Sequence, residues 1–429
     1  MNKRLREKCV AALLLLLPAA AGAQTVDERA LLLMRGSDGL SLSRLLIEHK
    51  DSLSEGVLAA GNAFVRGCQG DAKQAAKLMR RALKKYSDSF DGPLTAQLTF
   101  GVALQQHRCG RDRQAVKTLQ RFLQTHDSFA MKALFQQYER LFGASRAYRQ
   151  KWKGALDASI PFRLDSVGPP EARSVAVMLR PVVNGQAVDM MLDTGATMHV
   201  VSRSVAEQLG LQLTDISIFL DGMGENCGWL AIAETLRIGN VEARNVPFCV
   251  LDDTALAEDL AETAHQKTII GLPLLQQWGC VQFDFKSQTM HASADETIDE
   301  RNLSCGFSDN GLLLEVRHHG NRLQLIPDMG ATHSAVNARQ LTGQQHYLTD
   351  YLPHREVEFV GWGGRTAGRE YVYPQFDMAV GRTVVTLPQM SVLEGGDYES
   401  RLGMDFFSRC ERVTIRLSYP AGLSVMPRY

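Results

Sequence analysis

The sequence predicts a helical domain followed by a β-rich half built from two similar segments. Apolar residues recur with the 3.6-residue period of a helix over about residues 26–156, and they repeat at a fixed offset of 40 in the numbering. From residue 175 onward, short apolar runs are broken by glycine, asparagine and proline, which is typical of β-strands. Two of these runs match each other without gaps at an offset of 135 in the numbering.

Residues 1–23 have the three parts of a secretory signal peptide: a basic start, a short apolar run and small residues before Ala23. We expect cleavage there and a periplasmic protein; an uncleaved N-terminal anchor is the alternative. The remaining 406 residues (429 − 23) carry 43 basic (47 − 4) and 46 acidic (47 − 1) residues. This near-neutral charge predicts no nucleic-acid partner, and no later segment is apolar enough to span a membrane.

The helical domain is predicted to cover residues 24–157 as repeated helix–turn–helix units. The matching positions at the offset of 40 are Ala75 and Ala115, Met79 and Leu119, Ala82 and Phe122, Leu83 and Leu123, Gly61 and Gly101, and Gly70 and Gly110. We expect Gly70 and Gly110 in turns, where glycine accepts a positive φ. The pattern resembles a tetratricopeptide-like array without most of its consensus residues. Either it offers a concave surface to a protein partner or it only packs on the rest of the chain.

Cys68 and Cys109 hold nearly the same place in successive units, and an exported chain keeps disulfides. We therefore predict a disulfide between them. Residues 157–174 contain three prolines and no helical period, which indicates a domain boundary. The two β-rich segments are predicted over residues 158–297 and 298–429.

The matching runs of the β-rich half are NGQAVDMMLDTGATMHVVS from Asn184 and HGNRLQLIPDMGATHSAVN from His319. Asp193 aligns with Asp328, and Gly195-Ala196 aligns with Gly330-Ala331. Further matches follow in the same order: Gly222-Met223-Gly224 with Gly361-Trp362-Gly363, and Ile270-Gly271 with Leu402-Gly403. A duplicated aspartate loop with an apolar strand before it and matching elements after it predicts a tandem duplication.

Residues 175–429 therefore resemble two fused copies of a retropepsin-like aspartic protease domain of the bacterial gag type. The resemblance implies a multidomain α + β chain, in which the helical array precedes two all-β lobes that form a bilobed protease. It also implies catalytic roles for Asp193 and Asp328, supported by Thr194, Gly195, Ala196, Gly330 and Ala331. The glycine-rich hairpins around Met223 and Trp362 fall where this family has its substrate-covering flaps.

Two close carboxyl groups that share one proton can activate water and polarise a peptide carbonyl together. We therefore expect an exported aspartic endopeptidase that acts on a peptide or protein substrate, with no cofactor and no metal. In-chain pairing of Asp193 with Asp328 predicts a monomer. The alternatives are a catalytically weak peptide-binding adaptor and a homodimer in which Asp193 of one chain faces Asp193 of another.

The second aspartate loop departs from the family pattern at two positions. Met329 replaces the hydroxyl residue that in the family bonds across to the other loop, a loss of about 1 kcal/mol. Met329→Thr is therefore expected to preserve or raise both activity and stability. Pro327 stands where the first loop has Leu192, and proline has no N–H for a strand ladder. Both changes put the competence of Asp328 in question.

Overall fold

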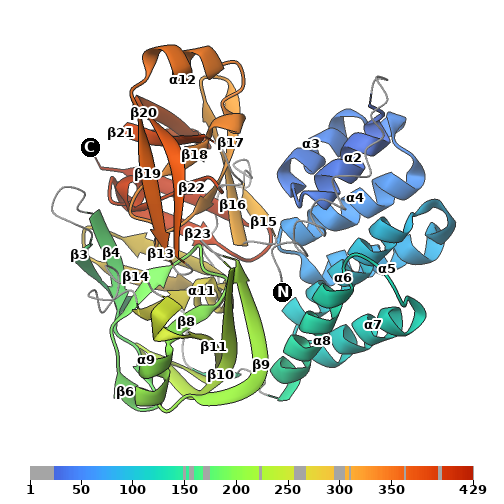
Figure 1. Ribbon diagram of the computed structural model, residues 1–429, viewed down its shortest axis with the longest axis horizontal. Helices are drawn as coiled ribbons and strands as arrows, with labels where there is room; N and C mark the ends of the chain where they lie inside the picture. Colours follow the sequence, from blue (N-terminus) through green and yellow to red (C-terminus); the bar gives the residue numbers. More distant parts are fainter. Residues whose placement is uncertain are drawn as a thin grey trace. The chain divides into compact units, whose positions relative to one another are not determined.

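The computed structural model describes residues 24–147, 151–153, 159–167, 174–221, 225–255, 267–293, 305–308, 311–361, 364–394 and 399–428. The chain forms two compact units. One runs to Arg149 and includes Gly306–Asp309, and the other comprises Gln150–Cys305 and Asn310–Tyr429. The first is helical and the second is β-rich, as the sequence predicts (Figure 1).

The helical unit is a succession of antiparallel helices joined by short turns. They are α2 (Val26–Arg35), α3 (Gly39–Glu48), α4 (Glu55–Cys68), α5 (Ala72–Lys85), α6 (Gly92–Arg108), α7 (Asp112–Thr125) and α8 (Lys132–Ala147). Aspartates cap several of these helices; Asp71 and Asp91, for example, accept the backbone N–H groups of Gln74 and Leu94.

The predicted offset of 40 recurs in the helices themselves. Helices α5 and α7 both have 14 residues, and both their first and their last positions differ by this offset. The matched side chains Ala75, Met79, Ala82, Ala115, Leu119 and Phe122 are all buried, which confirms the face predicted from the 3.6-residue period. Gly70 and Gly110 lie in the turns with φ of 91° and 67°, as expected.

Two predictions for this part of the chain need correction. The sequence places residues 151–153 in the helical domain, but they form strand β1 (Lys151–Lys153), which pairs with β11 (Val241–Leu251) of the β-rich unit. The structure also does not join Cys68 to Cys109. The Cys68 thiol packs against Gly39 at the start of α3, where a Cβ would lie 2.4 Å from the sulfur.

The first lobe is built on a large mixed sheet of the β-rich unit. Its strand order is β3-β4-β7-β12-β8-β11-β10-β5-β6, with β1 on β11 and β9 on β10. The strands are β3 (Arg163–Val167), β4 (Ser174–Leu179), β5 (Val182–Val183), β6 (Gln186–Ala187), β7 (Met190–Asp193), β8 (His199–Ser202), β9 (Gln212–Asp221), β10 (Glu225–Ile238), β11 and β12 (Thr268–Gly271). Helices α9 (Arg203–Gln208) and α11 (Leu272–Trp278) follow β8 and β12.

The second lobe is built on a sheet with the order β15-β16-β17-β22-β18-β21-β20-β19. Its strands are β15 (Cys305–Ser308), β16 (Gly311–His318), β17 (Asn321–Pro327), β18 (Ala335–Asn337), β19 (His354–Gly361), β20 (Gly364–Val380), β21 (Thr383–Glu394) and β22 (Arg401–Leu402). Helix α12 (Gln345–Tyr351) follows β18, and α13 (Met404–Phe407) follows β22.

The two sheets position their aspartates in the same way. In the first, β7 runs parallel to β12, and β8 runs parallel to β11. In the second, β17 runs parallel to β22, and β18 runs parallel to β21. Asp193 is the last residue of β7 and Asp328 directly follows β17, so each aspartate lies at the end of a strand beside the strand of the later apolar-glycine element.

A third sheet connects the lobes, with the order β2-β14-β13-β23-β24. It contains β2 (Ser159–Pro161), β13 (Cys280–Asp284), β14 (Thr289–Ser293), β23 (Cys410–Arg416) and β24 (Gly422–Pro427). The pair β13 and β23 is antiparallel, with Gln282 opposite Thr414. Alternate residues of this pair, such as Phe283 and Val413, are fully buried and fix the register of the sheet.

Within the described residues, none of the helices combines the length and apolar character needed to cross a bilayer.

Candidate active site

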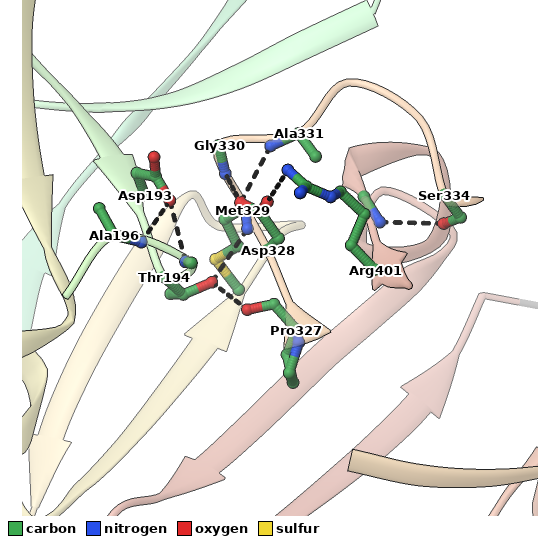
Figure 2. A network of polar contacts seen from close by, with 12 residues as sticks. Asp193, Thr194, Ala196, Pro327, Asp328, Met329, Gly330, Ala331, Ser334 and Arg401 are labelled. Atoms are coloured by element: carbon green, nitrogen blue, oxygen red, sulfur yellow. Dashed lines mark hydrogen bonds and ion pairs between the residues drawn. The ribbon is translucent and has the colours of Figure 1, made fainter. Parts of the chain in front are cut away.

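The two predicted aspartates are held by the same backbone bonds. One carboxylate oxygen of Asp193, Oδ1, accepts the N–H groups of Gly195 and Ala196, both at 2.9 Å (Figure 2). The Oδ1 atom of Asp328 accepts those of Gly330 and Ala331 at 2.9 and 3.1 Å. Each loop thus fixes its own carboxylate and leaves the second oxygen to other groups.

The glycines of the two loops show that the carboxyl groups face each other. A Cβ built on Gly195 would lie 2.7 Å from Cγ of Asp328, and one built on Gly330 would lie 2.4 Å from Cγ of Asp193. No side chain fits at such distances, so both positions require glycine. The structure therefore brings together all four of these predicted residues within one chain.

Thr194 links the two loops by hydrogen bonds across the site. Its hydroxyl donates to the carbonyl oxygen of Pro327 at 2.6 Å and accepts the backbone N–H of Met329 at 2.9 Å. The Thr194 side chain is 0% exposed, so these bonds are shielded from water. The link runs in one direction only, because Met329 has no hydroxyl with which to return it.

Met329 is itself 0% exposed. The methionine thus fills space in the second loop where a hydroxyl was expected from the resemblance. Replacing a buried methionine removes apolar contacts worth more than one hydrogen bond. The expected gain from Met329→Thr is therefore replaced by an expected loss.

Pro327 does not disturb the second loop. The N–H groups that bond toward β22 are those of Ile326 and Asp328, which donate to Ser400 and Leu402 at 2.8 Å each. The nitrogen of Pro327 points the other way, and the ladder between β16 and β17 ends at Leu325. The absence of an N–H on Pro327 therefore removes no hydrogen bond between strands. The carbonyl oxygen of Pro327 accepts the hydrogen bond from the Thr194 hydroxyl.

The paired carboxyl groups shift the titration of Asp193. Burial raises the pKa of its carboxyl to about 8, and the negative charge of Asp328 acts in the same direction. Hydrogen bonding between the two side chains also contributes to this rise. A proton is thus retained on the pair at neutral pH, which is the state that an acid–base pair requires.

Each loop is also anchored to the strand beside it, through side chains that the sequence analysis did not identify. In the first lobe, the Gly271 N–H donates to Nδ1 of buried His199 at 3.1 Å. In the second, the Gly403 N–H donates to Oγ of Ser334 at 2.9 Å, and Ser334 donates in turn to Asp405 at 2.6 Å. His199 and Ser334 align at the same offset as the two aspartates, so the internal match already contained this signal.

Burial lowers the pKa of His199 to about 4. The ring is therefore neutral over most of the pH range, and its Nδ1 accepts the bond from Gly271. Protonation at low pH would remove that acceptor.

Arg401 is another residue that the sequence analysis did not identify. Its Nη1 lies 3.1 Å from Oδ2 of Asp328, the oxygen not used by the backbone (Figure 2). The signal was a cation in the strand Arg401-Leu402, where the matching strand of the first lobe has Ile269-Ile270. Asp193 forms no such ion pair in the part of the chain that the structure describes.

The predicted flap residues are only partly within the described chain. Gly222, Met223, Gly224, Trp362 and Gly363 lie outside the described residues, while Gly361 ends β19. On either side of the first segment, Asp221 of β9 pairs with Glu225 of β10. Around the second, Gly361 pairs with Gly364. The hairpin strands are as predicted, and the substrate-binding role of these residues stays a prediction.

No group of three or more histidine, cysteine, aspartate or glutamate side chains is placed to hold a metal ion among the described residues. The side chains that meet at the described site supply two carboxyl groups, the hydroxyl of Thr194 and the guanidinium of Arg401.

Comparison with known proteins agrees with this geometry. Residues 179–274, which contain the first aspartate loop, match the model of a family described as Aspartyl protease. The match covers the first lobe alone. With the two sheets described above, it supports a retropepsin-like aspartic protease fold for the β-rich unit.

Solved structures with some similarity include a retropepsin-like aspartic protease from Rickettsia conorii, at 19% identity over 34% of this chain and 93% of that chain, with a TM-score of 0.23. Basic 7S globulin from soybean has 9% identity over 62% of this chain and 93% of that chain, with a TM-score of 0.38. These similarities are too remote to assign an activity. A comparison with curated proteins gives no match.

Proposed function

We propose that the β-rich unit is an aspartic endopeptidase in which Asp193 and Asp328 of one chain act as a single catalytic pair. The observation that carries this proposal is the reciprocal approach of the loops, in which Gly195 lies against the Asp328 carboxyl and Gly330 against the Asp193 carboxyl. Two carboxyl groups in such contact cannot both ionise easily, so they share a proton.

The reaction would proceed without a covalent intermediate. The ionised carboxyl accepts a proton from water as the water oxygen attacks the peptide carbonyl carbon, and the protonated carboxyl donates to the carbonyl oxygen. The tetrahedral species then breaks its C–N bond as the first carboxyl gives the proton taken from water to the amide nitrogen, and a hydroxyl of the tetrahedral species returns a proton to the second carboxyl. The pKa of Asp193, raised to about 8, supports a protonated partner at neutral and acidic pH.

The pairing of β13 with β23 supports an origin of the two lobes by duplication. Gln282 and Thr414 lie opposite each other, and their positions differ by 132 (414 − 282). The positions of Gly271 and Gly403 differ by the same amount (403 − 271). Equivalent residues of two copies meet in this way only on a local two-fold axis. A single chain would then supply both halves of the site, so we expect a monomer by light scattering after size-exclusion chromatography.

Export and partner binding complete the proposal. The features of residues 1–23 favour secretion to the periplasm, which N-terminal sequencing of the protein recovered from that compartment would test. The regular spacing of helices α5 and α7 supports a tetratricopeptide-like array that presents a protein substrate or partner.

The direct test of the function is cleavage of a denatured protein between pH 3 and 8, with and without pepstatin. We expect acid-favoured cleavage that pepstatin blocks and Asp193→Asn abolishes. Cleavage that survives Asp193→Asn would exclude this pair as its source.

A peptide-binding adaptor is the second candidate, and one contact favours it. Arg401 already bonds Oδ2 of Asp328, an oxygen that an attacking water would need. Peptide binding, measured by fluorescence anisotropy, together with no cleavage at any pH would favour the adaptor.

A further inference from the structure

Arg401 lies at a strand position that is apolar in the first lobe. In the parallel pairs beside the aspartate strands, Ile269 stands opposite Met191, and Arg401 stands opposite Ile326. Ile269 is buried, whereas the side chain of Arg401 is 33% exposed. An arginine in this place loses part of its hydration and needs an anionic partner to compensate.

Asp328 is that partner. Its Oδ1 accepts two backbone N–H groups, and its Oδ2 accepts Nη1 of Arg401 at 3.1 Å. Three donors thus bond this one carboxyl group, and one of them, the guanidinium, carries a positive charge. Asp193 has the same two backbone donors and no ion pair among the described residues.

Other charged groups around the second loop are directed elsewhere. Asp405 accepts both the N–H and the hydroxyl of Ser334, and His333 is exposed with its carbonyl against Gly403. Within the described residues, the charged groups that face Asp328 directly are therefore Asp193 and Arg401.

We propose that Arg401 is a positioning residue that keeps Asp328 as the carboxylate of the pair and so places the shared proton on Asp193. This inference rests on the proposed peptidase function. It assigns the two roles that a symmetric pair would leave interchangeable. Asp328 accepts the proton of the attacking water on Oδ2, which keeps one acceptor site beside the single bond from Arg401. Asp193 gives its proton to the carbonyl oxygen.

The assignment predicts how the pH–activity profile depends on Arg401. The acidic limb requires one ionised carboxyl and the basic limb requires one protonated carboxyl. A nearby cation stabilises the ionised forms, so its removal moves both limbs to higher pH. The expected shift for an opposite charge at this range is about one unit or more.

The test measures kcat/KM against pH for the wild type, Arg401→Ile and Arg401→Lys. Isoleucine occupies the matching position, Ile269, in the first lobe, and Arg401→Ile should move both limbs of the profile to higher pH. Lysine keeps the charge and should keep most of the wild-type profile. Arg322→Leu is the matched control, because Arg322 pairs with buried Glu315 at 2.8 Å outside the site, and it should leave both limbs unchanged. An active Arg401→Ile with wild-type limbs would overturn the proposal.

A second readout does not depend on catalysis. Above about pH 6.5, where the contribution of His199 no longer changes, the wild-type free energy of unfolding should fall with pH until the Asp193 carboxyl ionises. Arg401→Ile should extend that fall to higher pH by the same shift. If the wild type cleaves nothing but this extension occurs, the peptidase function is wrong and the charge assignment stands. If neither the profile nor the unfolding curve moves, the role of Arg401 is wrong.

Discussion

The loops that carry Asp193 and Asp328 have equivalent backbones and different side-chain surroundings. Both fix Oδ1 of the aspartate with two N–H groups, and both need glycine against the opposite carboxyl. The first loop supplies the cross-site hydroxyl of Thr194, while the second supplies the cation of Arg401.

The comparison shows which parts of this two-loop site depend on geometry and which depend on chemistry. The turn, the glycine and the neighbouring strand recur because each positions a carboxyl group close to its mate. The anchors His199 and Ser334 differ because any buried acceptor satisfies the N–H of Gly271 or Gly403. In the proposed mechanism, unequal side chains around equal backbones give two identical carboxyl groups different roles.

The largest effect on activity short of removing an aspartate is expected from the loop glycines. Gly330→Ala would place a methyl group 2.4 Å from Cγ of Asp193, and Gly195→Ala would place one 2.7 Å from Cγ of Asp328. Either change must separate the carboxyl groups, and a displacement of about 1 Å can cost on the order of a hundredfold in rate. Peptide cleavage kinetics measure the loss.

Gly143→Ala is the control for these variants, because a Cβ at Gly143 meets nothing within 4 Å. It should retain wild-type activity. Near-normal activity in Gly330→Ala and Gly195→Ala would show that the carboxyl groups need not approach each other.

The anchors should differ in how much stability they contribute. His199→Ala removes a buried ring and leaves the Gly271 N–H without its acceptor, for a loss of about 3 kcal/mol. Ser334→Ala removes a small hydroxyl that bonds Gly403 and Asp405, for a loss of about 1.5 kcal/mol. Urea unfolding at pH 7 gives both values. A larger loss in Ser334→Ala would reverse the ranking of the two anchors.

Met329→Thr tests whether the second loop lacks a hydroxyl or depends on a buried methionine. The side chain is 0% exposed, so the change should lower the free energy of unfolding by about 1–2 kcal/mol. Met329→Leu conserves the volume and should lose less. Thermal denaturation of both variants decides it, and a higher midpoint for the threonine variant would restore the symmetric description of the loops.

The pH dependence of stability should separate Asp193 from His199. The pKa of Asp193 is raised to about 8 from 3.8, so its stabilising contribution is complete below about pH 4 and is lost as pH rises toward 8. The pKa of His199 is lowered to about 4 from 6.5, so its contribution is complete above 6.5 and is lost as pH falls toward 4.

Between about pH 4 and 6.5, the free energy of unfolding falls with pH through Asp193 and rises with pH through His199, so the two contributions oppose each other. Between 6.5 and 8 only the fall caused by Asp193 remains. That fall is at most about 1.4 kcal/mol per pH unit. Urea unfolding of the wild type and Asp193→Asn over this range measures the difference. An identical slope in the two proteins above pH 6.5 would mean that Asp193 titrates normally.

The sequence predicted the features that recur within it. The repeat in the helical domain located α5 and α7 and their buried faces, and the gapless match in the β-rich half located both aspartates and their glycines. It failed where a role depends on contacts between distant segments. Strand β1 directly follows the helices and is defined only by its partner β11. Arg401 gains its role from Asp328, which is far from it in the sequence.

The hydrolysis rates of three variants test the central claim most directly. Residues that act as a unit have non-additive effects. Asp193→Asn, Asp328→Asn and the double variant should all lose peptide cleavage to about the same level, while their unfolding curves stay cooperative. Wild-type cleavage by Asp328→Asn beside an inactive Asp193→Asn would contradict an in-chain pair and indicate a dimer built on Asp193.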